Sequence, residues 1–378
     1  MPAQGELVTV SQQPTEVDVA VVGGGIVGLF CAWRARERGL SVAVFEAGDR
    51  DGVAWPVAAG MLAPVSEAQF GEHGARALRL GLAAADRWPS AARELGEASG
   101  IDPALRESGT LVLGRDRDEA EALEREAAHR ERLGLPVPRL RPSEARRREP
   151  ALAPTLRAAL EVPGDHSVDP RRVVAGLRAV LGDDVRPGAP AVRVAAGEVE
   201  LASGETVAAG RVLVAAGAWT GELLGLPVRP LKGQVVRLRD PSGPGLVTHT
   251  LRFSHVYLVP RADGRYVIGA TMEERGFDTD VTAGGVYELL RDAFELVPGI
   301  SELIVEETLA GLRPATPDTL PIVGEVDGVV VATGHGRDGV LLAPLTGDLV
   351  AGLLTGAPDE ELLALCDPAR FDRAGAAA

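Results

Sequence analysis

Cysteine is scarce in this chain of 378 residues, which contains only Cys31 and Cys366. Two thiols cannot build a disulfide framework or a four-cysteine metal site, so we expect a reducing compartment, the cytoplasm. The six histidines show no spacing that is typical of metal ligands. The sequence therefore predicts no metal centre.

Basic residues and long apolar runs are also in short supply. The 39 Lys and Arg residues are outnumbered by 54 Asp and Glu, and the formal net charge of −15 argues against a nucleic-acid partner. Lys232 is the single lysine, so Schiff-base chemistry would depend on that residue alone. Residues 1–16 do not resemble a secretory signal, and no apolar run reaches the roughly 18 residues of a membrane span. We expect no membrane partner.

The N-terminal region shows a strand–helix–strand pattern. The β-branched apolar residues 17–22 predict a buried strand, residues 26–38 a helix, and residues 41–46 a second strand. Near the other end of the chain, a strand over 329–332 is followed by a Gly-rich turn and a helix within 334–354. This arrangement predicts an α/β fold in which a Rossmann-like domain is assembled from discontinuous segments, with a second lobe inserted between them.

The first turn carries three glycines with the spacing Gly23-x-Gly25-x-x-Gly28. Gly23 permits the tight turn, Gly25 lets the backbone approach a pyrophosphate, and Gly28 lets the helix pack closely on the strand. Glu46, at the end of the second strand, can accept hydrogen bonds from ribose hydroxyls. The pattern predicts a bound dinucleotide, and the glycine turn at the far end of the chain favours FAD over NAD.

Between these units the patterning changes from helical to extended. Helices are expected over 74–98, with a break at Pro89, and over 116–133 and 171–181. Strand patterning then dominates from 191 to 310, apart from one helix near 284–296.

Three stretches resemble the D-amino-acid oxidase superfamily of flavoproteins, and within it most of all the glycine oxidases of thiamine biosynthesis. They are residues 58–64 (Ala-Ala-Gly-Met-Leu-Ala-Pro), residues 310–318 (Ala-Gly-Leu-Arg-Pro-Ala-Thr-Pro-Asp) and residues 334–344 (Gly-His-Gly-Arg-Asp-Gly-Val-Leu-Leu-Ala-Pro). The resemblance extends from about residue 17 to 355. It implies an FAD-binding domain and a substrate-binding domain built on an antiparallel sheet. The expected division is 15–85, 150–222 and 315–365 for FAD, 86–149 and 223–314 for substrate, and 1–14 and 366–378 as flexible tails.

The resemblance implies a set of cofactor-binding residues. They are Ile26 and Val27 for the diphosphate, Glu46 and Ala47 for the adenosine ribose, Val192 for adenine, Ala54, Trp55, Ala59, Gly60 and Met61 for the flavin phosphate and ring, and His335, Gly336, Arg337, Asp338, Gly339, Val340 and Leu341 around the ring. The FAD should be non-covalent, because no cysteine lies near residues 311–318, where related sarcosine oxidases link their flavin. The sequence departs from its relatives at 55–57, where Pro56 could shift the flavin loop, and at 336–339.

The resemblance also implies the substrate-binding residues. Arg313 would clamp a substrate carboxylate with its guanidinium, and Tyr257 would donate its hydroxyl to the same carboxylate. Arg337 lies at a family substrate position. His255 and Met272 are further pocket candidates, with packing in the core as the alternative for each.

The implied reaction is FAD-dependent oxidation of glycine, or of sarcosine or D-alanine, to glyoxylate, ammonia and hydrogen peroxide through an imine, within thiamine thiazole synthesis. Molecular oxygen would be the acceptor, although residues 266–269 contain no lysine of the kind that activates oxygen in relatives. The alternatives are a D-amino-acid, sarcosine or D-proline oxidase or dehydrogenase, and a non-catalytic flavin-binding subunit. The expected partners are a second copy of the chain and a thiazole-synthesis enzyme.

Overall fold

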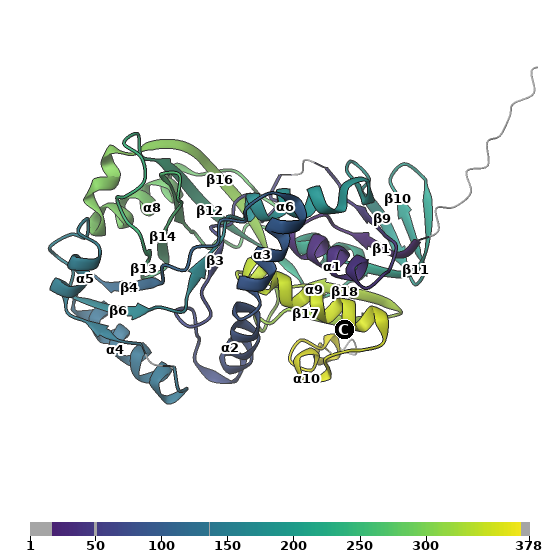
Figure 1. The fold of residues 1–378 in the computed structure, drawn as a ribbon, viewed down its shortest axis with the longest axis horizontal. Helices are drawn as coiled ribbons and strands as arrows, with labels where there is room; N and C mark the ends of the chain where they lie inside the picture. The colour runs from purple at the N-terminus through teal and green to yellow at the C-terminus, as the bar shows by residue number, and fades with distance from the viewer. Residues whose placement is uncertain (1–16, 49–50, 136, 372–378) are drawn as a thin grey trace, which may run out of the picture.

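The computed structural model describes residues 17–48, 51–135 and 137–371. Within these residues the strands form two eight-stranded sheets and one two-stranded sheet. Figure 1 shows the two large sheets at opposite ends of the molecule, with helices lying between and around them.

The centre of the first sheet is made of parallel strands. β1 (Val17–Val22) lies between β2 (Val42–Phe45) and β11 (Thr206–Val214), and β11 also pairs in parallel with β18 (Val329–Thr333). Strands β2 and β18 are buried along their whole length, as expected for parallel strands that are covered on both faces. The other strands of this sheet are β8 (Val185–Arg186), β9 (Ala191–Ala195), β10 (Glu198–Leu201) and β17 (Ile322–Val326).

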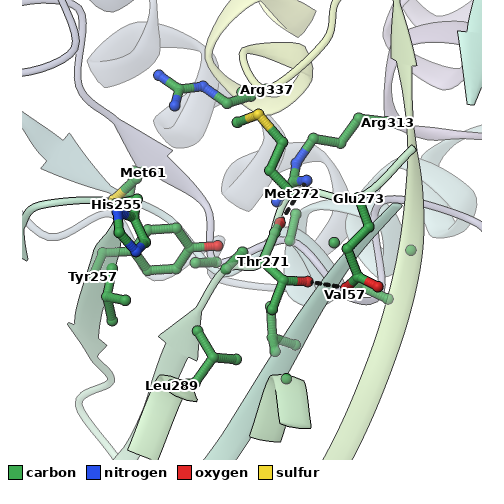
Figure 2. A pocket seen from close by; sticks show the side chains of 18 of the residues that line it. Val57, Met61, His255, Tyr257, Thr271, Met272, Glu273, Leu289, Arg313 and Arg337 are labelled. Atoms are coloured by element: carbon green, nitrogen blue, oxygen red, sulfur yellow. Dashed lines mark hydrogen bonds between the residues drawn. The ribbon is translucent and has the colours of Figure 1, made fainter. Parts of the chain in front are cut away.

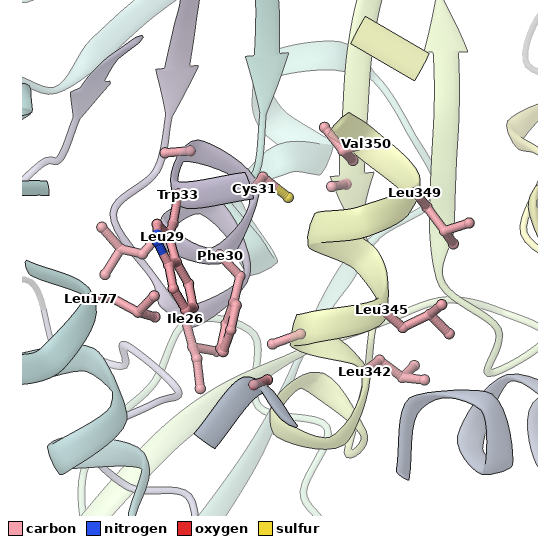
Figure 3. Packing of buried hydrophobic residues seen from close by; sticks show 14 of the residues in the cluster. Ile26, Leu29, Phe30, Cys31, Trp33, Leu177, Leu342, Leu345, Leu349 and Val350 are labelled. Atoms are coloured by element: carbon pink, nitrogen blue, oxygen red, sulfur yellow. The ribbon is translucent and has the colours of Figure 1, made fainter. Parts of the chain in front are cut away.

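Three helices pack together on this sheet. α1 (Ile26–Glu37) contacts both α9 (Gly339–Thr355) and α6 (Pro170–Leu181). Figure 3 shows α1 and α9 side by side, with Leu177 of α6 on the other side of α1. Phe30 of α1 is fully buried between them. A helix that is apolar on nearly all sides, as α1 is, must be buried on nearly all sides.

The second sheet has the strand order β16-β12-β15-β14-β13-β4-β6-β5. Its neighbouring strands pair antiparallel, as expected, except for the parallel pair β13–β4. Helix α8 (Ala283–Leu296) packs on it through Leu289 and Leu296. The strands are β4 (Thr110–Gly114), β5 (Arg139–Leu140), β6 (Ala158–Val162), β12 (Arg229–Arg239), β13 (Thr250–Phe253), β14 (Val256–Pro260), β15 (Arg265–Gly269) and β16 (Ile304–Ala315).

The remaining elements are shorter or lie between the sheets. They are β3 (Met61–Leu62), β7 (His166–Ser167), α2 (Gly71–Ala85), α3 (Trp88–Ser99), α4 (Arg117–Arg132), α5 (Pro142–Arg148), α7 (Thr220–Leu224) and α10 (Glu360–Leu363). The break expected at Pro89 is confirmed, because this proline stands in the first turn of α3, where its missing N–H costs no helical hydrogen bond.

Two of the expected boundaries need comment. Segment 150–222, which was expected in the FAD-binding domain, supplies strands to both sheets, because its strand β6 pairs with β4 and β5 of the second sheet. The division into two domains stays a prediction. The expected tail 366–378 is wrong for residues 366–371, because Cys366 is fully buried and Arg370 forms an ion pair with Asp318. The tail 1–14 and residues 372–378 lie outside the described residues. In the part of the chain that is described, no single helix is long and apolar enough to cross a membrane, and α9 passes such a test only together with the segment after a 115° bend.

Candidate cofactor groove and substrate pocket

The turn between β1 and α1 requires glycine at two of its three motif positions. Gly23 has a φ of +114°, and a Cβ there would overlap the carbonyl of Ala215. A Cβ on Gly28 would overlap the carbonyl of Gly23. Both glycines therefore allow the strand and the helix to approach each other, as the fingerprint predicts.

Gly25 differs from both, because a Cβ there would meet no atom within 4 Å. The space that it faces is a cavity of about 430 Å³ beside the N-terminus of α1, which we call the β1–α1 cavity. Many residues expected at the cofactor line it: Gly23, Gly25, Ile26, Val27, Glu46, Ala47, Ala54, Trp55, Val192, His335 and Gly339. Free backbone N–H groups at a helix N-terminus suit an anionic diphosphate, so these residues fit the group that the motif implies.

A second cavity, of about 670 Å³, adjoins the first. We call it the Arg313 cavity. It is lined by β12, β14 and β16, by α8, by residues of the segment 57–63 and by the start of α9 (Figure 2). Ala54 lines both cavities, so a long ligand can extend from one to the other. The other expected cofactor residues in it are Ala59, Gly60, Met61, Arg337, Asp338 and Val340. Gly28, Gly336 and Leu341 line neither cavity.

The loop between the two cavities is held by three arginines, of which Arg237 and Arg261 are buried. The carbonyl of Pro56 accepts hydrogen bonds from Arg171 Nε (3.0 Å) and Arg237 Nη2 (2.8 Å). Arg261 donates to the carbonyl of Ala59 at 2.5 Å. Burial, together with the neighbouring guanidinium charges, lowers the pKa of Arg237 to about 10, which leaves it a cation at neutral pH. Pro56 is thus an anchored part of this loop.

Arg313 reaches into the second cavity from β16. Its Nη1 donates to the carbonyls of Thr271 (3.1 Å) and Lys232 (3.3 Å), and its guanidinium lies over Gly233, where any Cβ would collide with it. Burial lowers its pKa, although an arginine keeps its charge near neutral pH. Within the described residues, Arg313 forms no ion pair with a carboxylate. Such a cation is available for an anionic ligand.

Tyr257 lies across the cavity from Arg313. Figure 2 shows its hydroxyl and the Arg313 guanidinium directed into the same space. The hydroxyl lies over Gly269 of β15, where a Cβ would displace it. Burial raises the pKa of Tyr257, so the phenol remains protonated and can donate a hydrogen bond.

Arg337 has a different environment from Arg313. Its Nη2 is 2.9 Å from Oε2 of Glu67, whose charge raises the pKa of Arg337. Oε1 of Glu67 is also 3.8 Å from Nε of Arg252. Glu67 and Arg252 both line the cavity, and sequence reasoning missed them. The available signal was the position of Glu67, three residues after the stretch 58–64.

Asp338 and Asp165 are acidic groups near this ion-pair cluster. Burial, reinforced by the charge of Glu67, raises the pKa of Asp338 to about 6. Burial raises the pKa of Asp165 to about 6 as well, although it accepts hydrogen bonds from the backbone N–H groups of Val65 and Ser66. These bonds fix the segment that presents Glu67.

His255 and Met272 both line the Arg313 cavity and are exposed. The alternative of core packing is therefore wrong for both. Lys232 is fully buried, donates to Asp278 at 2.9 Å and lines neither cavity. It is not placed for Schiff-base chemistry. Across residues 17–48, 51–135 and 137–371, no group of three or more His, Cys, Asp or Glu side chains could hold a metal ion.

Comparisons with known proteins agree with this arrangement. The family described as FAD dependent oxidoreductase matches residues 18–353. Glycine oxidase from Geobacillus kaustophilus is 37% identical over 358 residues, which cover 89% of this chain and 92% of that protein. The crystal structure of a glycine oxidase from Geobacillus kaustophilus has a TM-score of 0.84 at 35% identity and covers 90% of this chain and 95% of that one. The bifunctional protein ThiO/ThiG of Trichormus variabilis is 33% identical over 94% of this chain, which spans 55% of that protein.

Proposed function

This chain belongs to the FAD dependent oxidoreductase family and is an FAD-dependent amine oxidoreductase, and we propose that its substrate is glycine or a similarly small amino acid. One observation carries the proposal. A half-buried arginine without a carboxylate partner in the described residues faces a tyrosine hydroxyl, in a cavity that adjoins the β1–α1 cavity. A carboxylate is the group that such a pair would bind.

The residues of the Arg313 cavity would orient the substrate. Arg313 binds the carboxylate through two N–H groups, and Tyr257 adds a neutral donor. The carbonyls of Thr271 and Lys232 hold the guanidinium in position, so little ordering remains when the substrate enters. The nearby positive charge also favours the neutral amine over the ammonium form.

The chemistry that FAD supplies when bound is the acceptance of a hydride from the Cα–H of the amine. The residues of the β1–α1 cavity would hold its dinucleotide part, and Ala59, Gly60 and Met61 would contact its ring. Overall, glycine, water and oxygen are converted to glyoxylate, ammonia and hydrogen peroxide, because the imine hydrolyses in water.

Thiamine thiazole synthesis is the proposed pathway. The proposal is supported by the likeness to ThiO/ThiG, a protein described as bifunctional, of which the match with this chain covers 55%. A thiazole-synthesis enzyme as partner, assembly with a second copy of the chain and a cytoplasmic location belong to the same proposal.

A dehydrogenase that uses an acceptor other than oxygen is the second candidate. It is favoured by the position of Lys232, the single lysine of the chain. This residue is ion-paired with Asp278 and lines neither cavity, so no lysine side chain reaches the substrate to activate oxygen.

Two measurements test these proposals. Glycine, sarcosine, D-alanine and D-proline are added anaerobically to the purified yellow protein, and we expect glycine to bleach the visible flavin band most efficiently. Hydrogen peroxide is then measured under air. Bleaching without peroxide would identify a dehydrogenase, higher efficiency with D-proline would refute the glycine assignment, and no bleaching by any amine would indicate a non-catalytic flavin-binding subunit.

A further inference from the structure

Arg178, which belongs to none of the sequence motifs, binds the carboxylate of Glu46 at the β1–α1 cavity. Glu46 follows β2 and lines the β1–α1 cavity. Arg178, which lies in α6 and 132 positions away, donates from Nη2 to both carboxylate oxygens, at 2.8 and 2.6 Å. The Glu46 side chain is only 13% exposed, against 41% for Arg178. The carboxylate is therefore largely shielded from water, whereas the Arg178 side chain is partly exposed.

Arg178 also contacts a second part of the cavity wall. Its guanidinium carbon lies 5.5 Å from the centre of the Trp55 ring, a distance at which a cation is attracted to an aromatic face. Trp55 lines the same cavity as Glu46. Its Nε1–H is buried and has no hydrogen-bond partner among the residues that the structure describes, so this donor is available to a ligand. One side chain of α6 thus supports two groups that face the dinucleotide.

The charges around this cavity make the ion pair important. The charged side chains that line it are Glu46 and Glu222, and both are acidic. His335 also lines it, but burial lowers its pKa to about 4, so it is neutral at pH 7. Among the described residues that line it there is no lysine or arginine. The diphosphate of FAD is an anion, and loss of the Arg178 charge would strengthen its repulsion by the Glu46 carboxylate in a site that is partly shielded from water.

We propose that Arg178 is a cofactor-positioning residue that neutralises Glu46 and fixes its orientation. A carboxylate can accept about four hydrogen bonds. Arg178 donates to both oxygens, and ribose hydroxyls would donate to the same carboxylate at other positions. The same guanidinium steadies Trp55, another residue of the cavity wall. The inference rests on FAD binding in the β1–α1 cavity and does not depend on the identity of the amine substrate.

The experiment measures FAD affinity of the apoprotein by fluorescence titration. We expect Arg178→Gln to raise the Kd for FAD by about tenfold or more, and the defect to shrink as salt is added, because salt screens the repulsion from Glu46. Arg178→Lys, which keeps the charge, should bind more tightly than Arg178→Gln. Arg172→Gln is the matched control: Arg172 is on the same helix, is exposed and, within the described part of the chain, donates only to the carbonyl of Asp102.

A double variant separates positioning from simple structural support. If the Glu46 charge causes the defect, Glu46→Gln in the Arg178→Gln background should restore part of the affinity. Thermal unfolding of each apoprotein reports stability independently. The proposal is overturned if Arg178→Gln leaves the Kd within twofold of wild type, if the double variant binds more weakly than Arg178→Gln, or if every change in Kd follows the loss of apoprotein stability. Failure of glycine to bleach the flavin would leave these affinities unaffected, so the two proposals fail separately.

Discussion

Gly25→Ala should separate cofactor binding from folding. Gly25 is the N-cap of α1, with φ −76° and ψ 174°, a conformation that alanine adopts without strain. A Cβ there meets no protein atom within 4 Å and points into open space beside the β1–α1 cavity. The added methyl group would therefore meet the ligand rather than the protein.

The two effects differ in size. Alanine lowers the entropy of the unfolded chain, which is worth about 0.4–1 kcal/mol, but it is a poorer N-cap than glycine by a comparable amount. The free energy of unfolding of the apoprotein should thus change by less than about 1 kcal/mol. A methyl group that keeps the diphosphate from one charge-assisted hydrogen bond costs about 1.5–3 kcal/mol, or roughly a 10- to 150-fold higher Kd for FAD.

Urea unfolding of the apoprotein and fluorescence titration with FAD measure these quantities. Gly23→Ala provides the contrast, because its φ of +114° and its overlap with the carbonyl of Ala215 should destabilise the fold itself by more than about 2 kcal/mol. A Kd for Gly25→Ala within threefold of wild type would refute the assignment of this turn to the diphosphate.

Three further predictions concern the second cavity and acid stability. Arg313→Ala should retain FAD but lose about 2–5 kcal/mol of transition-state binding, roughly 30- to 4,000-fold in kcat/KM for glycine. A loss below threefold would assign Arg313 to structure. Tyr257→Phe should lose only about 0.5–1.5 kcal/mol of transition-state binding. Glu67→Gln should release Arg337 and raise kcat/KM for D-aspartate relative to glycine by about tenfold, whereas an unchanged ratio would show that Arg337 does not reach a second carboxylate. Burial lowers the pKa of His335 to about 4, so between pH 6.5 and 4 the unfolded chain binds a proton that the folded protein does not. The free energy of unfolding therefore falls as the pH falls through this window. In urea unfolding, His335→Gln should lose less stability than wild type between pH 7 and 4.5, and equal losses would contradict the shifted pKa.

The sequence by itself determined the local units and the identity of the family. β1, β18 and α1 lie where their patterns predict, to within a residue, because runs of apolar residues and helical periodicity reflect burial of neighbouring side chains. The roles of Gly23 and Gly28 were also readable, since a tight strand–helix turn leaves no room for a Cβ. The family resemblance is confirmed by the match over residues 18–353.

Only the tertiary structure decided which charges are paired. Arg313 and Arg337 look alike in the sequence, yet Arg337 is paired with Glu67, which is 270 positions away, whereas Arg313 has no carboxylate partner in the described residues. Arg178 meets Glu46 across 132 positions. Such pairs leave no local pattern, because their partners are brought together by the packing of separate helices and sheets. The availability of a cation for a ligand is therefore a property of the folded chain and not of any motif.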